Sequence, residues 1–71
     1  MTEKDLIRRL LKEADLYRTQ GLLSDAKSKY VQILSVIGKS KTLVEHKPLI
    51  AGVKRKIRAV DKSLTELRDT P

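Results

Sequence analysis

The amino-acid sequence predicts an all-α protein that folds as an antiparallel three-helix bundle. Three segments carry apolar residues at the three- and four-residue spacing of an amphipathic helix, and β-branched residues are scattered instead of alternating. Only Tyr17 and Tyr30 are aromatic, a composition that favours helix over sheet. A chain of 71 residues has room for one small core, so we expect a single helical domain over residues 1–71.

The first helix is expected over about residues 3–20. Thr2 is a suitable N-cap, and Glu3 and Asp5 place negative charge in the first turn, where the helix dipole favours it. One broad apolar stripe is formed by Leu6, Ile7, Leu10, Leu11, Ala14 and Tyr17. The opposite face, which we expect to be solvated, carries Arg8, Lys12, Asp15 and Thr19.

The second helix is expected over about residues 24–37. Gly21 supplies the left-handed conformation that closes the preceding helix, and Ser24 is a natural N-cap for the next one. Gly38 is the expected terminator. The predicted apolar stripe consists of Ala26, Tyr30, Ile33, Leu34 and Ile37.

Residues 38–47 are polar and basic, and they predict a linker. Thr42 and Glu45 have the spacing of a capping box, which favours a short helical turn within it. Pro48 is comfortable at a first helical position, so the third helix is expected over about residues 48–67.

The third helix carries the clearest periodicity in the chain. Its apolar residues follow the spacing of a helical bundle or coiled coil and form a narrow seam of Ile50, Val53, Ile57, Val60, Leu64 and Leu67. Gly52 lies in the helix interior, where it costs about 1 kcal/mol relative to alanine. With Ala59 and Ser63 it forms a small-residue strip. This strip either lets the third helix nestle against the first or receives a partner helix.

The net charge of +7 is spread unevenly. Residues 1–38 hold seven basic and five acidic residues, whereas residues 39–71 hold nine and four. Arg55, Arg58 and Lys62 project opposite the apolar seam, where they either solubilise an exposed face or attract an acidic peptide, nucleic acid or an anionic membrane surface. No stacking platform or phosphate loop accompanies them, so specific nucleic-acid recognition has little support.

Chemistry at a catalytic or metal centre is not expected. Cysteine is absent, and the one histidine, His46, lies beside Glu45 without further ligands nearby in the sequence. No cofactor is predicted. The N-terminal segment lacks the pattern of a signal peptide, and no apolar run reaches the ~20 residues that span a bilayer, so we expect a soluble, cytoplasmic domain. The polar end, residues 68–71, suits a linker within a larger protein.

The predicted hairpin resembles a tetratricopeptide repeat over about residues 9–38. Gly21 in the loop, Ala26 and Tyr30 stand at the relative positions of that family's small and aromatic residues. Three residues of the first helix match a small position and two large apolar ones: Ala14, Leu10 and Leu16. The family's final alanine and terminal proline are replaced by Ile33 and Gly38. No second repeat follows, so the third helix is expected to cap a solitary repeat, whereas stacked arrays ordinarily hold about three.

The three-helix architecture also resembles microtubule-interacting-and-trafficking domains, with residues 57–67 in the third helix as the added similarity. Arg58, Ala59 and Asp61 reproduce the charged and small residues of that family only in part. The resemblance implies a groove beside the third helix that binds short helical or extended peptides.

Together these patterns predict a non-catalytic adaptor or assembly module that binds another protein, or a peptide segment of acidic or helical character. A partner segment is expected along the exposed faces of the first and third helices. The candidate partner-binding residues are Arg8, Lys12, Leu16, Gly52, Arg55, Arg58 and Lys62. One alternative is homodimerisation through the third-helix seam, and another is non-specific binding of nucleic acid or an anionic surface by the basic C-terminal half.

Overall fold

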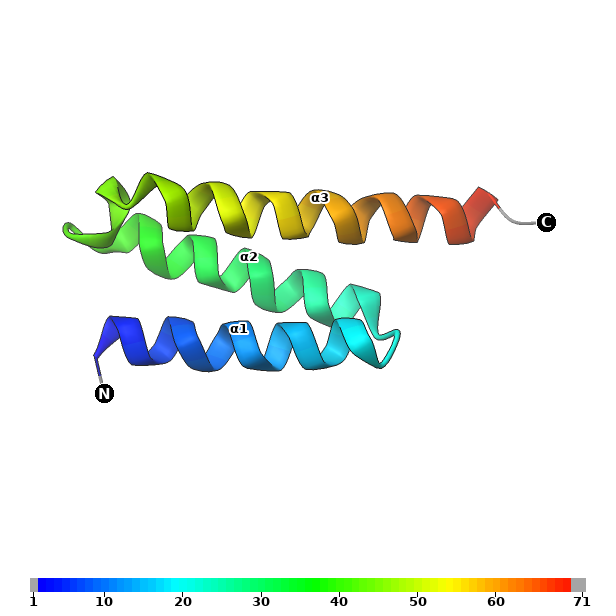
Figure 1. The fold of residues 1–71 in the computed structure, drawn as a ribbon, viewed down its shortest axis with the longest axis horizontal. Helices are drawn as coiled ribbons and strands as arrows, with labels where there is room; N and C mark the ends of the chain where they lie inside the picture. The colour runs from blue at the N-terminus through cyan, green and yellow to red at the C-terminus, as the bar shows by residue number, and fades with distance from the viewer. Residues whose placement is uncertain (1, 70–71) are drawn as a thin grey trace.

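The all-α prediction is confirmed by a computed structural model, which describes residues 2–69 of the chain and the side chains of residues 2–66. Helices α1 (Glu3–Thr19), α2 (Leu23–Lys39) and α3 (Lys47–Asp69) follow one another, with the 3₁₀ turn η1 (Leu43–Glu45) before α3 (Figure 1). No strand occurs among the described residues. The side chain of Leu67, expected on the seam, and residues 70–71 of the expected linker lie outside the described part of the chain.

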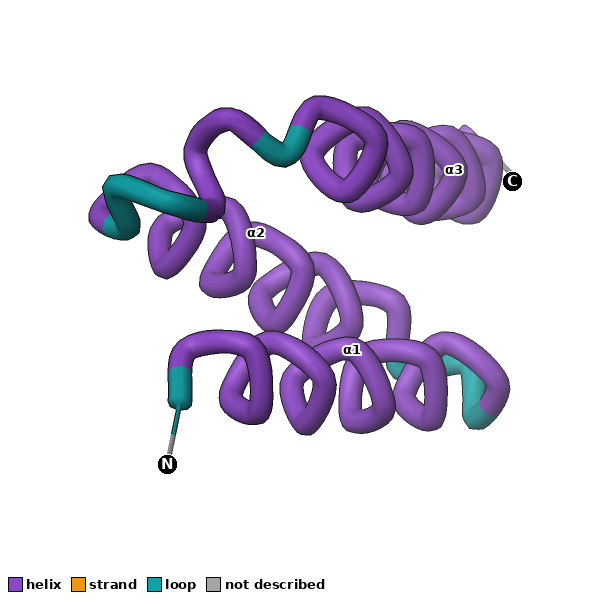
Figure 2. The backbone as a smooth tube through the Cα atoms, turned by 60° about the vertical axis from the view of Figure 1, so that its left-hand side comes forward, coloured by secondary structure: helices purple, strands orange, loops and turns teal. Residues whose placement is uncertain are grey.

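Helix α2 lies between the other two helices and runs antiparallel to both (Figures 1 and 2). It packs against α1 and against α3, whereas α1 and α3 run in the same direction and scarcely touch. The prediction that Gly52 lets the third helix nestle against the first is therefore wrong. A Cβ atom built on Gly52 meets nothing within 4 Å, because the seam of α3 packs on α2 instead.

The core is made of the predicted apolar stripes. The buried side chains are Ile7, Leu10, Ala14, Ala26, Tyr30, Ile33, Ile37, Leu43, Val53 and Val60. Ala14 on α1 and Ala26 on α2 are completely inaccessible, as expected for small side chains in a closely packed core. Leu11, Ile50, Ile57 and Leu64 are half-buried at the margins of this core.

The ends of the first two helices match the predicted ends only in part. Thr2 caps α1, since its Oγ1 accepts a hydrogen bond of 3.2 Å from the Asp5 amide, and Gly21 has the expected positive φ of 81°. Ser24 is not the N-cap of α2, because the helix already begins at Leu23. Gly38 does not end α2 either; the helix continues through it to Lys39.

The connection between α2 and α3 is more than the polar linker that its composition predicts. Leu43 is buried in the core, with 4% of its surface exposed. The expected short turn forms around it, but the capping box does not, since Thr42 makes no side-chain capping bond. The buried hydroxyl of Ser40 accepts the bond from the Leu43 amide instead, at 3.2 Å. Residues 40–45 therefore anchor the connection to the bundle.

His46 is the N-cap of α3. Its Nδ1 accepts a hydrogen bond from the Leu49 amide at 3.3 Å, and its carbonyl accepts the first helical bond from the Ile50 amide at 3.2 Å. Pro48 lies one position later in the helix than expected, and its missing N–H costs nothing within the first turn. The imidazole thus satisfies one of the free backbone amides at the start of α3.

Replacing His46 tests this cap. His46→Ala is expected to lower the free energy of unfolding by about 1 kcal/mol, because the Leu49 amide loses its acceptor. His46→Asp is expected to restore stability, since a carboxylate accepts the same bond and is favoured at a helix N-terminus. Urea unfolding followed by circular dichroism measures both, and equal stabilities for the wild type and His46→Ala would show that the imidazole is not a cap.

Candidate functional site

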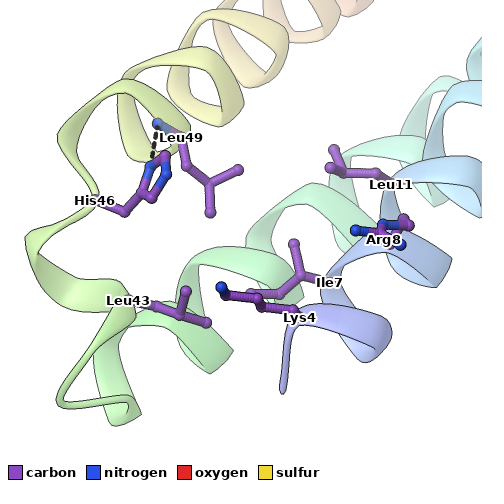
Figure 3. Close-up of a pocket in the computed structure, with 7 residues that line it drawn as sticks. All are labelled: Lys4, Ile7, Arg8, Leu11, Leu43, His46 and Leu49. Carbon is purple, nitrogen blue, oxygen red and sulfur yellow. Dashed lines mark hydrogen bonds between the residues drawn. The ribbon is translucent and has the colours of Figure 1, made fainter. Parts of the chain in front are cut away.

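A groove runs between α1 and α3, where α2 holds them apart. It consists of two hollows, of about 320 and 210 Å³, that share Leu11 and Leu49. The first hollow is lined by Lys4, Ile7, Arg8, Leu11, Leu43, His46 and Leu49 (Figure 3). The second is lined by Leu11, Pro48, Leu49, Gly52, Val53 and Lys56. We call this continuous depression the α1/α3 groove.

The floor and walls of the α1/α3 groove are apolar. Buried side chains of Ile7, Leu43 and Val53 form part of the lining, and the half-buried Leu11 and Leu49 supply opposite walls (Figure 3). Helical geometry produces these walls, because residues four apart lie above one another on one side of a helix. The groove thus exposes leucine surface from which water can be displaced.

The charged groups along the α1/α3 groove are basic. Lys4 and Arg8 line the first hollow and Lys56 lines the second, whereas no acidic side chain lines either hollow in the described structure. Lys4 and Arg8 are exposed and form no ion pair with any described residue. The site is therefore electrostatically suited to an anionic group beside an apolar one.

A polar cluster links all three helices beside the second hollow. The Tyr30 hydroxyl donates a hydrogen bond to Oδ1 of Asp15, and the Lys56 ammonium lies 3.2 Å from both oxygens of the same carboxylate. The Lys56 Nζ also lies 5.8 Å from the centre of the Tyr30 ring, within cation–π range. Asp15 from α1, Tyr30 from α2 and Lys56 from α3 thus form what we call the three-helix clamp.

The clamp shifts the protonation equilibria of its members. Burial, together with the hydrogen bond to Asp15, raises the pKa of Tyr30 to about 12. Burial acts against ionisation of Asp15, but the hydrogen bonds from Tyr30 and Lys56 outweigh it and lower the pKa of that carboxyl. Both shifts favour a neutral phenol that donates to an ionised carboxylate.

Two further ion-pair groups tie α2 to its neighbours. Glu13 on α1 contacts Lys29 at 2.9 Å and Arg9 at 3.1 Å, and hydrogen bonds from these two cations lower the pKa of Glu13. Lys27 on α2 contacts Asp61 on α3 at 2.7 Å. Because these pairs are exposed or half-exposed, they help to orient the helices but contribute little to the stability of the fold.

The structure separates the residues predicted to bind a partner. Arg8 and Gly52 lie in the α1/α3 groove, and Lys12 lines a separate depression along α1 together with Arg8. Leu16 is 55% exposed outside both hollows of the groove. The remaining predicted cations are exposed on α3 and line neither hollow: Arg55, Arg58 and Lys62.

Sequence reasoning missed several residues of the site, among them Lys4 in the first hollow. Leu11 was assigned to the core stripe, although it also forms a groove wall, and Asp15 was assigned to the solvated face, although it belongs to the clamp despite being 50% exposed. Leu49 and Lys56 were not singled out. Their spacing from Gly52 places them on the same side of the third helix, and the sequence could have shown this. It could not have shown that they lie beside α1, because Asp15 and Lys56 are 41 residues apart in the chain.

Within the described residues, no group of three or more His, Asp or Glu side chains is arranged to hold a metal ion. None of the helices there has the length and apolar character of a membrane span. Comparisons with protein-family models, with curated proteins and with solved structures found no match to this chain. The function of the α1/α3 groove is therefore judged from its own geometry and charge.

Alanine substitutions separate the roles of two glycines. Gly52→Ala is expected to raise the free energy of unfolding by about 1 kcal/mol, because helix propensity improves and nothing obstructs the new methyl group. Gly21→Ala is the matched control with the opposite sign and is expected to cost about 1 kcal/mol, because its φ of 81° disfavours a side chain. Urea unfolding measures both. Destabilisation by Gly52→Ala would instead reveal a close backbone approach.

The clamp predicts how stability depends on pH. Asp15 has a lowered pKa in the fold, so its contribution is present above the ordinary value of 3.8 and is lost as the pH falls through the folded value. Tyr30 has a raised pKa, so its contribution is present below pH 10 and is lost as the pH rises toward about 12. We expect Tyr30→Phe to lower the free energy of unfolding by about 1 kcal/mol at neutral pH, because one hydrogen bond to a half-exposed carboxylate is lost. We also expect the variant to lose less stability than the wild type as the pH rises toward about 12.

Urea unfolding at a series of pH values checks this expectation. Lys29 also has a raised pKa, through its hydrogen bond to Glu13, so the wild type declines at alkaline pH for two reasons and the difference between variants isolates Tyr30. Tyr17→Phe is the control for loss of a tyrosine hydroxyl elsewhere. The clamp assignment fails if Tyr30→Phe and Tyr17→Phe give the same alkaline profile.

Proposed function

We propose that this domain is a non-catalytic protein–protein interaction module of tetratricopeptide-like type, and that it binds a segment of another protein in the α1/α3 groove. The observation that carries the proposal is the groove itself, an apolar depression between two helices that α2 keeps apart. Short peptide segments are commonly bound by helical domains in grooves of this kind.

The arrangement of the groove supports binding of a segment instead of catalysis. Its exposed leucine surface favours apolar side chains at about 25 cal/mol for each Å² removed from water. The three-helix clamp fixes α1 relative to α3 beside the second hollow. A groove held in this way loses little conformational entropy when it is occupied, and that improves affinity.

The alternatives have weaker support. The seam of α3 places Val53 and Val60 in the chain's own core, with 2% and 1% of their surfaces exposed, so these side chains offer little to a second copy. Tyr30 is buried and Tyr17 half-buried, which argues against aromatic stacking of nucleic-acid bases. The cations of α3 remain suited to weak, salt-sensitive attraction of anions.

Selection from a random-peptide display library tests the proposal without a known partner. Selected peptides are expected to shift the methyl NMR signals of Leu11, Leu49 and Val53 in the groove. The methyl signals of Leu16 and Leu22, which are exposed elsewhere, serve as internal controls. The proposal is wrong if no peptide is enriched, or if enriched peptides shift the control signals and leave the groove signals unchanged.

A further inference from the structure

We infer that the α1/α3 groove recognises an acidic amphipathic helix that presents two apolar side chains one turn apart, with carboxylates directed at Lys4 and Arg8. This inference rests on the proposed function and names the chemical class of its partner. Three observations carry it: the division of the groove into two hollows, the open space over Gly52, and the charges on the rim.

The two hollows set the number and spacing of the apolar anchors. Leu49 borders both hollows, and Val53, one turn further along α3, lines only the second. Adjacent turns of a helix are about 5.4 Å apart, which is also the offset between side chains at i and i+4 of a bound helix. One anchor thus enters the hollow formed with Ile7 and Leu43, and the other enters the hollow above Gly52.

Gly52 lowers the stability of α3, and the fold itself does not explain why a glycine occupies this position. Glycine in a helix interior costs about 1 kcal/mol relative to alanine. Gly52 does not have a positive φ, and a Cβ atom there would meet nothing within 4 Å, so neither backbone conformation nor packing requires the residue. Its missing side chain leaves the second hollow open, and that space accommodates the partner's second anchor.

The rim determines the charge of the partner. Lys56 is already engaged by Asp15, whereas Lys4 and Arg8 have no ion-pair partner among the described residues. Both of these side chains line the first hollow, and no carboxylate in the described lining competes for them. A basic segment would be repelled there, so the pair selects acidic residues beside the first anchor.

Synthetic fluorescein-labelled helical peptides test the inference by anisotropy. The first peptide carries leucines at i and i+4 with glutamates flanking them, and the second replaces those glutamates with lysines. We expect the acidic peptide to bind at least about fivefold more tightly, the ratio equivalent to ~1 kcal/mol. Arg8→Glu is expected to weaken the acidic peptide and strengthen the basic one. Arg58→Glu makes the same charge change outside the groove, so it is expected to alter the ratio far less than Arg8→Glu does.

Gly52→Leu provides a steric block without disturbing the core. The added side chain occupies the second hollow, so binding of the acidic peptide is expected to fall by at least about tenfold, while the melting temperature stays equal to or above that of the wild type because helix propensity improves. Circular dichroism verifies the fold of each variant. Gly52→Ala improves helix propensity to a similar degree but adds far less volume, so it separates the effect of helix propensity from that of the steric block.

The outcomes distinguish the inference from the proposed function. If the basic peptide binds as tightly as the acidic one and Gly52→Leu blocks both, the groove is a binding site but its selectivity for acid is refuted. Failure of the acidic peptide to bind, while library-selected peptides of other composition bind the groove, refutes the inference alone. If Gly52→Leu leaves the affinity of all bound peptides unchanged, both the inference and the proposed site are refuted.

Discussion

The fold depends on one constraint, which is that α2 buries apolar side chains against two helices at once. The side chains buried along this helix are Ala26, Tyr30, Ile33 and Ile37, and the helix packs against both α1 and α3. Helices α1 and α3 each pack on α2 and make few contacts with each other, which leaves Leu11 and Leu49 half-buried between them. The groove between α1 and α3 is therefore a consequence of both helices packing on α2.

Tyr30 connects this packing to the polar clamp. Its ring lies in the core, while its hydroxyl reaches Asp15 on α1 and its face lies near the Lys56 ammonium of α3. Because the Tyr30 ring is buried, its hydroxyl has a defined position. This hydroxyl and the Lys56 ammonium both bind the half-exposed carboxylate of Asp15. The clamp thus links two helices that make few contacts of their own.

Charge and shape act together on the surface that remains. A net charge of +7 favours anionic partners in general, but most of the exposed cations are spread over open helix faces, where solvent and salt weaken their attraction. Lys4 and Arg8 differ because they border an apolar hollow. For the proposed partner, apolar contact beside these two cations would exclude the water that otherwise screens the interaction.

Sequence alone predicts the helices and most of the core, because apolar periodicity, the Thr2 cap and the Gly21 turn are local properties that involve only a few neighbouring residues. It misplaced the ends near Ser24 and Gly38 and treated Leu43 as part of a polar linker, since backbone hydrogen bonds and tertiary burial overrode local preference there. It identified Arg8 and Gly52 as candidate binding residues. The packing of α3 on α2 and away from α1 could not be predicted in this way, because an amphipathic pattern defines a buried face without specifying the helix that covers it. The same packing placed Asp15 against Lys56 and opened the groove, through contacts between residues far apart in the chain.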